Sequence, residues 1–112
     1  MLDFQRLDVY RCSIELVVLA VGLTDGAPRG NAALLDQLRR AASSIPRSIA
    51  EATGRTSEPD AARHFAIARG SAMECAAVLD VCRALGLVDE DRHRRGYELV
   101  ERIVGMLTRL CR

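Results

Sequence analysis

The sequence contains no tryptophan and no lysine, and phenylalanine and tyrosine together supply only four of its 112 residues. Aromatic and β-branched residues nowhere alternate with polar ones over the length of a strand, which argues against a β-sheet. The apolar run 16–23 is too short to span a bilayer, and charged residues near the start, such as Asp3 and Asp8, are unlike a secretory signal. We therefore expect a cytoplasmic protein with no membrane partner.

Motifs for metals, cofactors and catalysis are also scarce. The four cysteines lack C-x-x-C spacing and fall at or beside apolar helical positions, which predicts buried free thiols: Cys12, Cys75, Cys82 and Cys111. Glu90 and His93 have the Glu-x-x-His spacing of di-iron bundles, but a second copy of the motif is missing. We expect no nucleophile or orienting carboxylate beside His64 or His93. The sequence thus predicts no metal, no cofactor and no enzymatic activity.

What the chain does have is alanine, leucine and apolar residues at helical spacing. Hydrophobic residues make up 49% of the sequence, and helix caps and turn residues divide it into four helices. These are expected at about 8–22, 31–54, from a start within 56–60 to 86, and 89–111, with a turn-rich segment at 22–30. We predict an all-α fold, a left-handed up-down-up-down four-helix bundle forming one domain over residues 1–112.

Each predicted helix has an apolar stripe for the core. The stripes comprise Val9, Cys12, Leu16, Leu19 and Leu23; Leu38, Ala42, Ile45, Ile49 and Ala52; Phe65, Ala68, Ala72, Cys75, Leu79 and Cys82; and Val100, Ile103, Val104, Leu107 and Leu110. The first helix carries a second apolar set: Ile14, Val17, Val18 and Val21. A helix that is apolar around most of its circumference is unusual in a monomeric bundle, so we expect this set to contact another subunit.

Pro46 interrupts the strongest of these stripes. A proline inside a helix removes a backbone hydrogen bond and costs about 3 kcal/mol. Ser44 could cap a new helical segment that has Pro46 in its first turn. The segment is then either a kinked core helix or a site whose local strain reflects function or assembly.

Polar residues of the second and third helices form a set too large for an ordinary solvated face: Gln37, Arg40, Ser44, Glu51, Arg69, Ser71 and Glu74. We expect a network in which arginines and glutamates of the two helices satisfy each other and fix register or partner choice. The alternative is contact with a ligand or nucleic acid, for which Arg40, Arg47 and Arg69 are the candidates.

A basic row follows one side of the last helix, where Arg95, Arg102 and Arg109 recur every two turns. The formal net charge is only +1, so the chain as a whole has little attraction for phosphate. The row is therefore either a solvated face or, repeated around a symmetric ring, a band of positive charge that holds a polyanion.

The segment 37–46, which reads Gln-Leu-Arg-Arg-Ala-Ala-Ser-Ser-Ile-Pro, and the following Ile49-Ala50-Glu51 resemble the four-helix-bundle proteins encoded in 23S rRNA intervening sequences (S23-like proteins). Further matches are Phe4, Leu7, Val9, Tyr10, Phe65, the segment 67–71 and Glu74. The chain departs locally, with Arg47-Ser48 where the family reads Ser-Asn, and Ala52-Thr53 before Gly54.

The resemblance implies a four-helix bundle that assembles as a ring-like homopentamer. It also implies a relation to accessory variability determinants of diversity-generating retroelements, and RNA, or an RNA-bound protein, as partner. The function expected from it is a non-catalytic, self-assembling adaptor that binds RNA. The alternative is a structural or protein-interaction scaffold with no nucleic-acid role.

Overall fold

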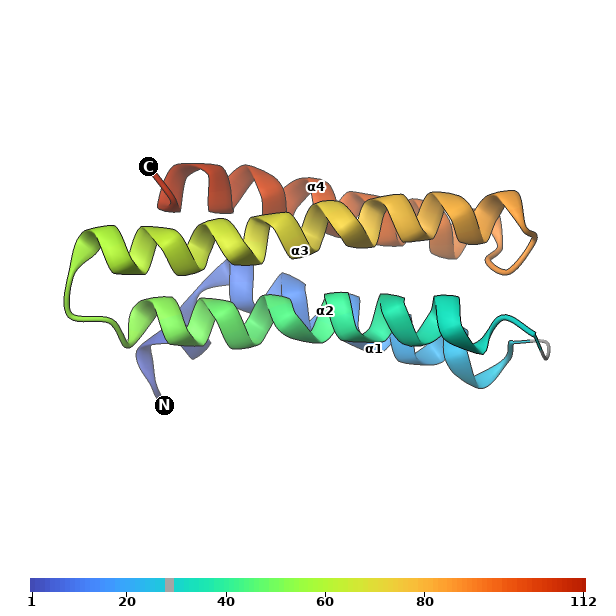
Figure 1. The fold of residues 1–112 in the computed structure, drawn as a ribbon, viewed down its shortest axis with the longest axis horizontal. Coiled ribbons are helices and arrows are strands. Elements are labelled where there is room, and N and C mark those ends of the chain that lie inside the picture. The colour runs from blue at the N-terminus through green and yellow to red at the C-terminus, as the bar shows by residue number, and fades with distance from the viewer. Residues whose placement is uncertain (28–29) are drawn as a thin grey trace.

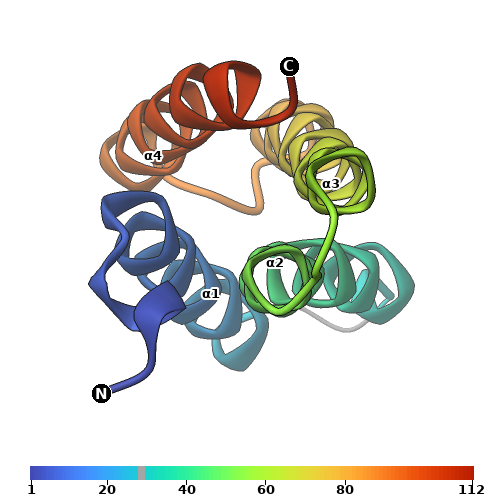
Figure 2. The ribbon, with the colours of Figure 1, turned by 90° about the vertical axis from the view of Figure 1, so that its left-hand side faces the viewer.

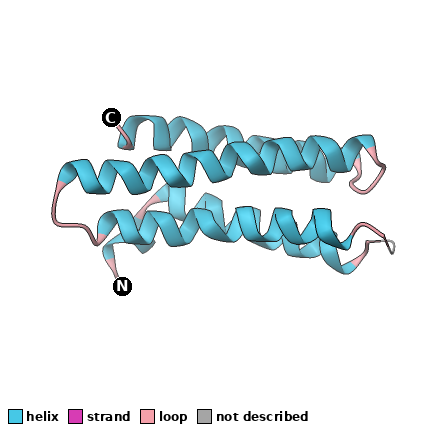
Figure 3. Cartoon of the chain, viewed as in Figure 1, coloured by secondary structure: helices cyan, strands magenta, loops and turns pink. Residues whose placement is uncertain are grey.

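The computed structural model describes residues 1–27 and 30–112, and in these residues it is helical without β-strands (Figures 1 and 3). The elements are η1 (Asp3–Arg6), α1 (Asp8–Asp25), α2 (Ala32–Thr53), α3 (Glu58–Ala84) and α4 (Glu90–Leu110). None of the described helices is both long and apolar enough to cross a membrane. Pro28 and Arg29, in the segment expected to form a turn at a bundle end, lie outside the described residues.

Consecutive helices run antiparallel along a body of 45 × 23 × 20 Å. Each helix packs against its two neighbours and α1 closes the bundle against α4, whereas the backbones of the diagonal pairs do not come within 8 Å (Cα to Cα) in the described part of the chain. Figure 2 accordingly shows α1 and α3 at opposite corners, with α2 and α4 at the other two. This is the up-down-up-down order expected from four amphipathic helices with short connections.

The helix ends follow the predicted signals, with two differences. Ser57 caps α3, since its Oγ accepts a hydrogen bond from the Asp60 N–H at 3.3 Å, and Gly86 ends it with a φ of 73°. However, α1 continues to Asp25, beyond its predicted end at Gly22. Gly54, at the predicted end of α2, has a right-handed conformation with a φ of −85° and not the left-handed one that often ends a helix.

One hydrophobic core takes residues from all four helices. Every member of the predicted α2 and α3 stripes is buried, which confirms the spacing argument. In α1, Leu19 is only partly buried and Ala20 takes the core position. In α4, Leu110 is exposed because it is the last residue of the helix and lies beyond the packed turns.

Helix α2 passes through Pro46 without a break. Ser44 does not cap a new segment, because its Oγ bonds to the Ala41 carbonyl at 2.9 Å and to Ser71 Oγ at 2.5 Å. Ile45 and Ile49, on either side of the proline, are fully buried. Burying two such side chains contributes a few kcal/mol, which offsets a proline penalty of about 3 kcal/mol and keeps both halves in one helix.

Candidate nucleic-acid interface and assembly surfaces

The arginine row of α4 lies along the groove between α4 and α1. Arg95 donates to a carboxylate oxygen of Glu15, in α1, at 2.6 Å. Two turns beyond Arg102, Arg109 lines a surface pocket of about 250 Å³ with Leu7 and Asp8, at the start of α1. The heptad spacing read from the sequence therefore corresponds to one edge of the helix.

Carboxylates neutralise the first half of α4. Arg95 also approaches Glu98 at 3.8 Å, and Arg92 donates to Asp89 at 2.7 Å, which lowers the pKa of that carboxyl group. Arg94 pairs with Asp91. These arginines therefore have acidic partners within the chain already.

The second half of the row differs. Within residues 1–27 and 30–112, neither Arg102 nor Arg109 forms an ion pair, although both side chains are exposed. The positive charge of the row that remains available to a phosphate is thus concentrated on the C-terminal half of α4.

The other three candidate arginines lie apart from one another. Arg40 pairs with Asp36 of its own helix at 3.4 Å, and Arg47 donates to the Ser43 carbonyl. Arg69 is half-buried and donates through Nε to Thr108 Oγ1 of α4 at 2.9 Å. The structure therefore does not bring Arg40, Arg47 and Arg69 together into one binding site.

The expected network between α2 and α3 is also divided. Gln37 Nε2 donates to Glu74 at 3.0 Å, and both side chains are exposed in the single chain. Ser44 and Ser71 form a separate half-buried contact. The expected single network of arginines and glutamates is therefore not formed, because these residues occupy the outer edge of the α2–α3 contact and make separate contacts there.

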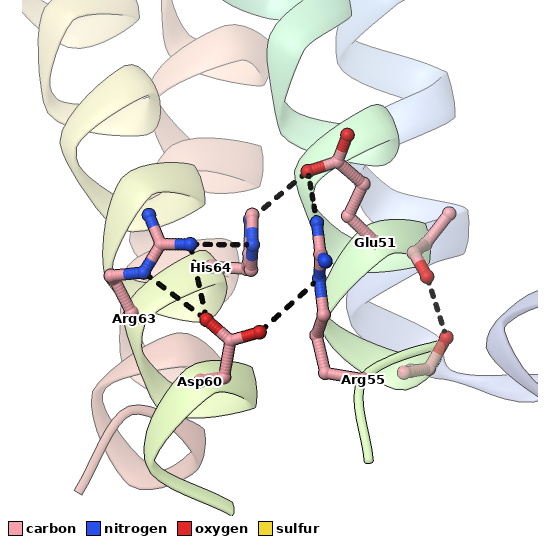
Figure 4. A network of polar contacts seen from close by, with 7 residues as sticks. Glu51, Arg55, Asp60, Arg63 and His64 are labelled. Carbon is pink, nitrogen blue, oxygen red and sulfur yellow. Dashed lines mark hydrogen bonds and ion pairs between the residues drawn. The ribbon is translucent and has the colours of Figure 1, made fainter. Parts of the chain in front are cut away.

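Glu51 belongs instead to a cluster at the end of α2 and the start of α3 (Figure 4). Its carboxylate lies 3.1 Å from Nδ1 of the buried His64, whose Nε2 lies 3.1 Å from Arg63. Asp60 bridges Arg63 at 3.1 Å and Arg55 at 3.5 Å. Because arginine can only donate, the contact with Arg63 requires Nε2 to accept, which leaves Nδ1 as the donor to Glu51.

His93 repeats the arrangement between α3 and α4. Its Nε2 lies 2.9 Å from Asp80 and its Nδ1 lies 3.5 Å from Arg83, while the Tyr97 ring stacks on it at 5.9 Å. The expectation that neither histidine has an adjacent carboxylate is thus wrong. In both pairs the carboxylate precedes the histidine by 13 positions across a turn, a signal that the antiparallel helices make readable.

These clusters hold helices together and show no metal geometry. No group of three or more histidine, cysteine or acidic side chains in the described part of the chain could hold a metal ion. The four cysteines are free, and three are buried: Cys12, Cys75 and Cys82. Burial, with a smaller effect of the Glu74 charge, raises the pKa of the Cys75 thiol to about 12, so it remains protonated and unreactive.

Two apolar faces remain exposed on the bundle. The first, called the α1 face, comprises Ile14, Val18 and Val21, with Val18 67% exposed. Val17, the fourth member of the predicted set, is half-buried against the core. Three of the four side chains predicted to contact another subunit therefore lie on the outer surface of the bundle.

The second apolar surface, called the α3 face, was not predicted from the sequence. It comprises the exposed Ile67, Met73 and Val81 together with the exposed small residues Ala66, Gly70 and Ala77. The signal was present, since most residues between the core positions of this helix are apolar or small. By contrast, α2 exposes no large hydrophobic side chain.

Comparison with known proteins agrees with this architecture. The family model described as 23S rRNA-intervening sequence protein matches residues 5–109. Among solved structures, the chain is similar to a crystal structure of a protein with unknown function from the S23 ribosomal protein family of Bacteroides thetaiotaomicron. The TM-score is 0.84 at 21% identity, covering 93% of this chain and 98% of that chain, which shows a shared fold. No curated protein matches the sequence.

Proposed function

Because the chain belongs to the 23S rRNA-intervening sequence protein family, we propose that it is a non-catalytic, self-assembling adaptor that binds RNA in the cytoplasm. We propose that it acts as a ring-like homopentamer and is related to the accessory variability determinants of diversity-generating retroelements. The single observation that carries the RNA proposal is the pair of exposed arginines, Arg102 and Arg109, that lack carboxylate partners in the described part of the chain.

Self-assembly is supported by the α1 face. Fully burying one aliphatic side chain of this size stabilises a contact by about 1.5–3 kcal/mol. Because Ile14 and Val21 are 38% exposed and Val18 is 67% exposed, a contact that covers all three gains about 2–4 kcal/mol before the cost of association. A single chain with a net charge of +1 attracts RNA only weakly. A ring would strengthen the attraction, because it repeats the Arg102 and Arg109 pair in every subunit.

RNA binding through α4 rests on backbone phosphates. Guanidinium groups bind phosphate oxygens through paired hydrogen bonds, and each phosphate neutralised releases counterions. Binding by Arg102 and Arg109 is consequently expected to depend strongly on salt and weakly on RNA sequence. The scaffold alternative is favoured by a different observation, namely that Glu15 and Glu98 already neutralise Arg95.

The test compares two double variants in the same helix. Arg102→Gln with Arg109→Gln removes the unpaired arginines, and Arg92→Gln with Arg94→Gln removes two that are already paired with acids. We expect the first variant to lose RNA retention and the second to keep most of it, with both rings intact by size-exclusion chromatography. In a salt titration, the slope of log K against log salt should become shallower by about 0.7 for each single-strand phosphate that the variant no longer neutralises.

Equal RNA retention by wild type and by the Arg102→Gln, Arg109→Gln variant would contradict this assignment. Absence of RNA binding by the intact wild-type assembly would leave the scaffold as the function.

A further inference from the structure

The α1 face and the α3 face lie at opposite corners of the bundle (Figure 2). The outward sides of α2 and α4, which separate them, are dominated by charged residues. One copy of the chain thus presents two separate apolar surfaces, and its own fold covers neither. Contiguous apolar patches exposed to water are typical of interaction sites.

We propose that the occupant of each face is a second copy of this chain, with the α1 face of one copy packed on the α3 face of the next. This inference rests on the self-assembly in the proposed function and adds which surfaces meet. The two faces differ in composition: the α1 face has the aliphatic side chains of Ile14, Val18 and Val21, whereas the α3 face includes Gly70 and Ala77, whose small size leaves room for them. Larger side chains that pack against small residues let two helices approach closely.

The charges beside the faces are complementary as well. A groove next to the α1 face is lined by Val17 and Val21 of α1 and by Asp36, Arg39, Arg40 and Ser43 of α2. Arg40 pairs with Asp36, whereas Arg39 has no ion pair within the described residues. The α3 face is bordered by two exposed acids, Glu74 and Asp80. An α1 face opposite another α1 face would bring like surfaces together, whereas an α1 face opposite an α3 face brings arginine towards carboxylates.

Contact between two different faces repeats from copy to copy, and it closes into a ring when successive rotations add to a full turn. Because the two faces are on different helices of the same chain, each copy has one face for the copy before it and one for the copy after it.

The test uses one charge on each face. Val18→Asp spoils only the α1 face and Ala77→Asp spoils only the α3 face, and both positions are exposed, so the bundle should fold. Each variant alone should be a monomer by native mass spectrometry. An equimolar mixture should form heterodimers, because each chain keeps the face that its partner needs and the dimer then has no intact face left. Leu110→Asp, an exposed aliphatic position outside both faces, is the matched control and should leave the assembly intact.

If circular dichroism shows that either single variant is unfolded, a pair of opposite charges tests the same contact. Val18→Lys combined with Ala77→Glu in one chain should restore the assembly that each substitution alone disrupts. An Ala77→Asp variant that remains assembled, or a mixture that stays monomeric, would overturn the pairing of the two faces while leaving self-assembly standing. A monomeric wild type would instead overturn the proposed function itself.

Discussion

Replacing Gly96 by alanine tests a close contact between α3 and α4. A Cβ atom at Gly96 would lie 2.8 Å from Leu79 Cδ1 and 3.6 Å from Leu19 Cδ2. Leu79 is fully buried, so its methyl group can move only by disturbing the core. Gly105, in the same helix, has no atom within 4 Å of such a Cβ, which makes it the matched control.

The magnitudes follow from two opposing effects. Alanine is favoured over glycine in a helix interior by about 1 kcal/mol, and this gain applies at both positions. Overpacking a filled core costs about 1–3 kcal/mol, and this applies only at Gly96. We therefore expect Gly105→Ala to stabilise the protein by about 1 kcal/mol. Gly96→Ala should range from neutral to a loss of about 2 kcal/mol.

The assay is urea unfolding followed by far-UV circular dichroism at one protein concentration, because assembly makes stability depend on concentration. The free energy of unfolding of the two variants should differ by about 1–3 kcal/mol. Equal stabilisation by both substitutions would refute the close contact between Gly96 and Leu79.

Three further predictions address the caps, the thiols and the histidine clusters. Ser57→Ala should lower the free energy of unfolding by about 1 kcal/mol, whereas Asn31→Ala should change it little, because Asn31 makes no side-chain cap bond. Equal losses of stability in urea unfolding would contradict the capping role of Ser57. Burial raises the pKa of the Cys75 thiol from 9.0 to about 12, so its contribution to the free energy of unfolding is complete below pH 9.0 and is lost as the pH rises towards about 12. Cys75→Ala should therefore make the loss of stability at alkaline pH less steep. Asp80→Ala should cost about 1–3 kcal/mol by leaving the buried His93 N–H unpaired, and an unchanged melting curve would contradict this pairing.

The helices were predictable because their signals are local. Periodicity identified the core positions from Leu38 to Ala52, and a proline with neighbouring acids in the segment 56–60 identified the start of α3. The outcome at Pro46 was harder to predict. Whether a proline breaks a helix depends on how firmly both sides are packed, and the burial of Ile45 and Ile49 is a tertiary property.

The candidate site was less predictable, because its contacts join residues distant in sequence. Glu51 was assigned to a network with Glu74, but the turn between α2 and α3 places it beside His64. The neutralisation of Arg95 by Glu15 requires α1 and α4 to be adjacent, which only the closed bundle specifies. Helical spacing could say that a row of arginines exists, but it could not say which of them remain available to a ligand.

Native mass spectrometry of protein purified without nuclease tests the central claim most directly, because one spectrum reports both the number of subunits and any bound nucleic acid. The account predicts a pentamer with additional mass that nuclease removes from the wild type and that is missing from the Arg102→Gln, Arg109→Gln variant. A monomer, or a bare assembly that also ignores added structured RNA, would contradict it.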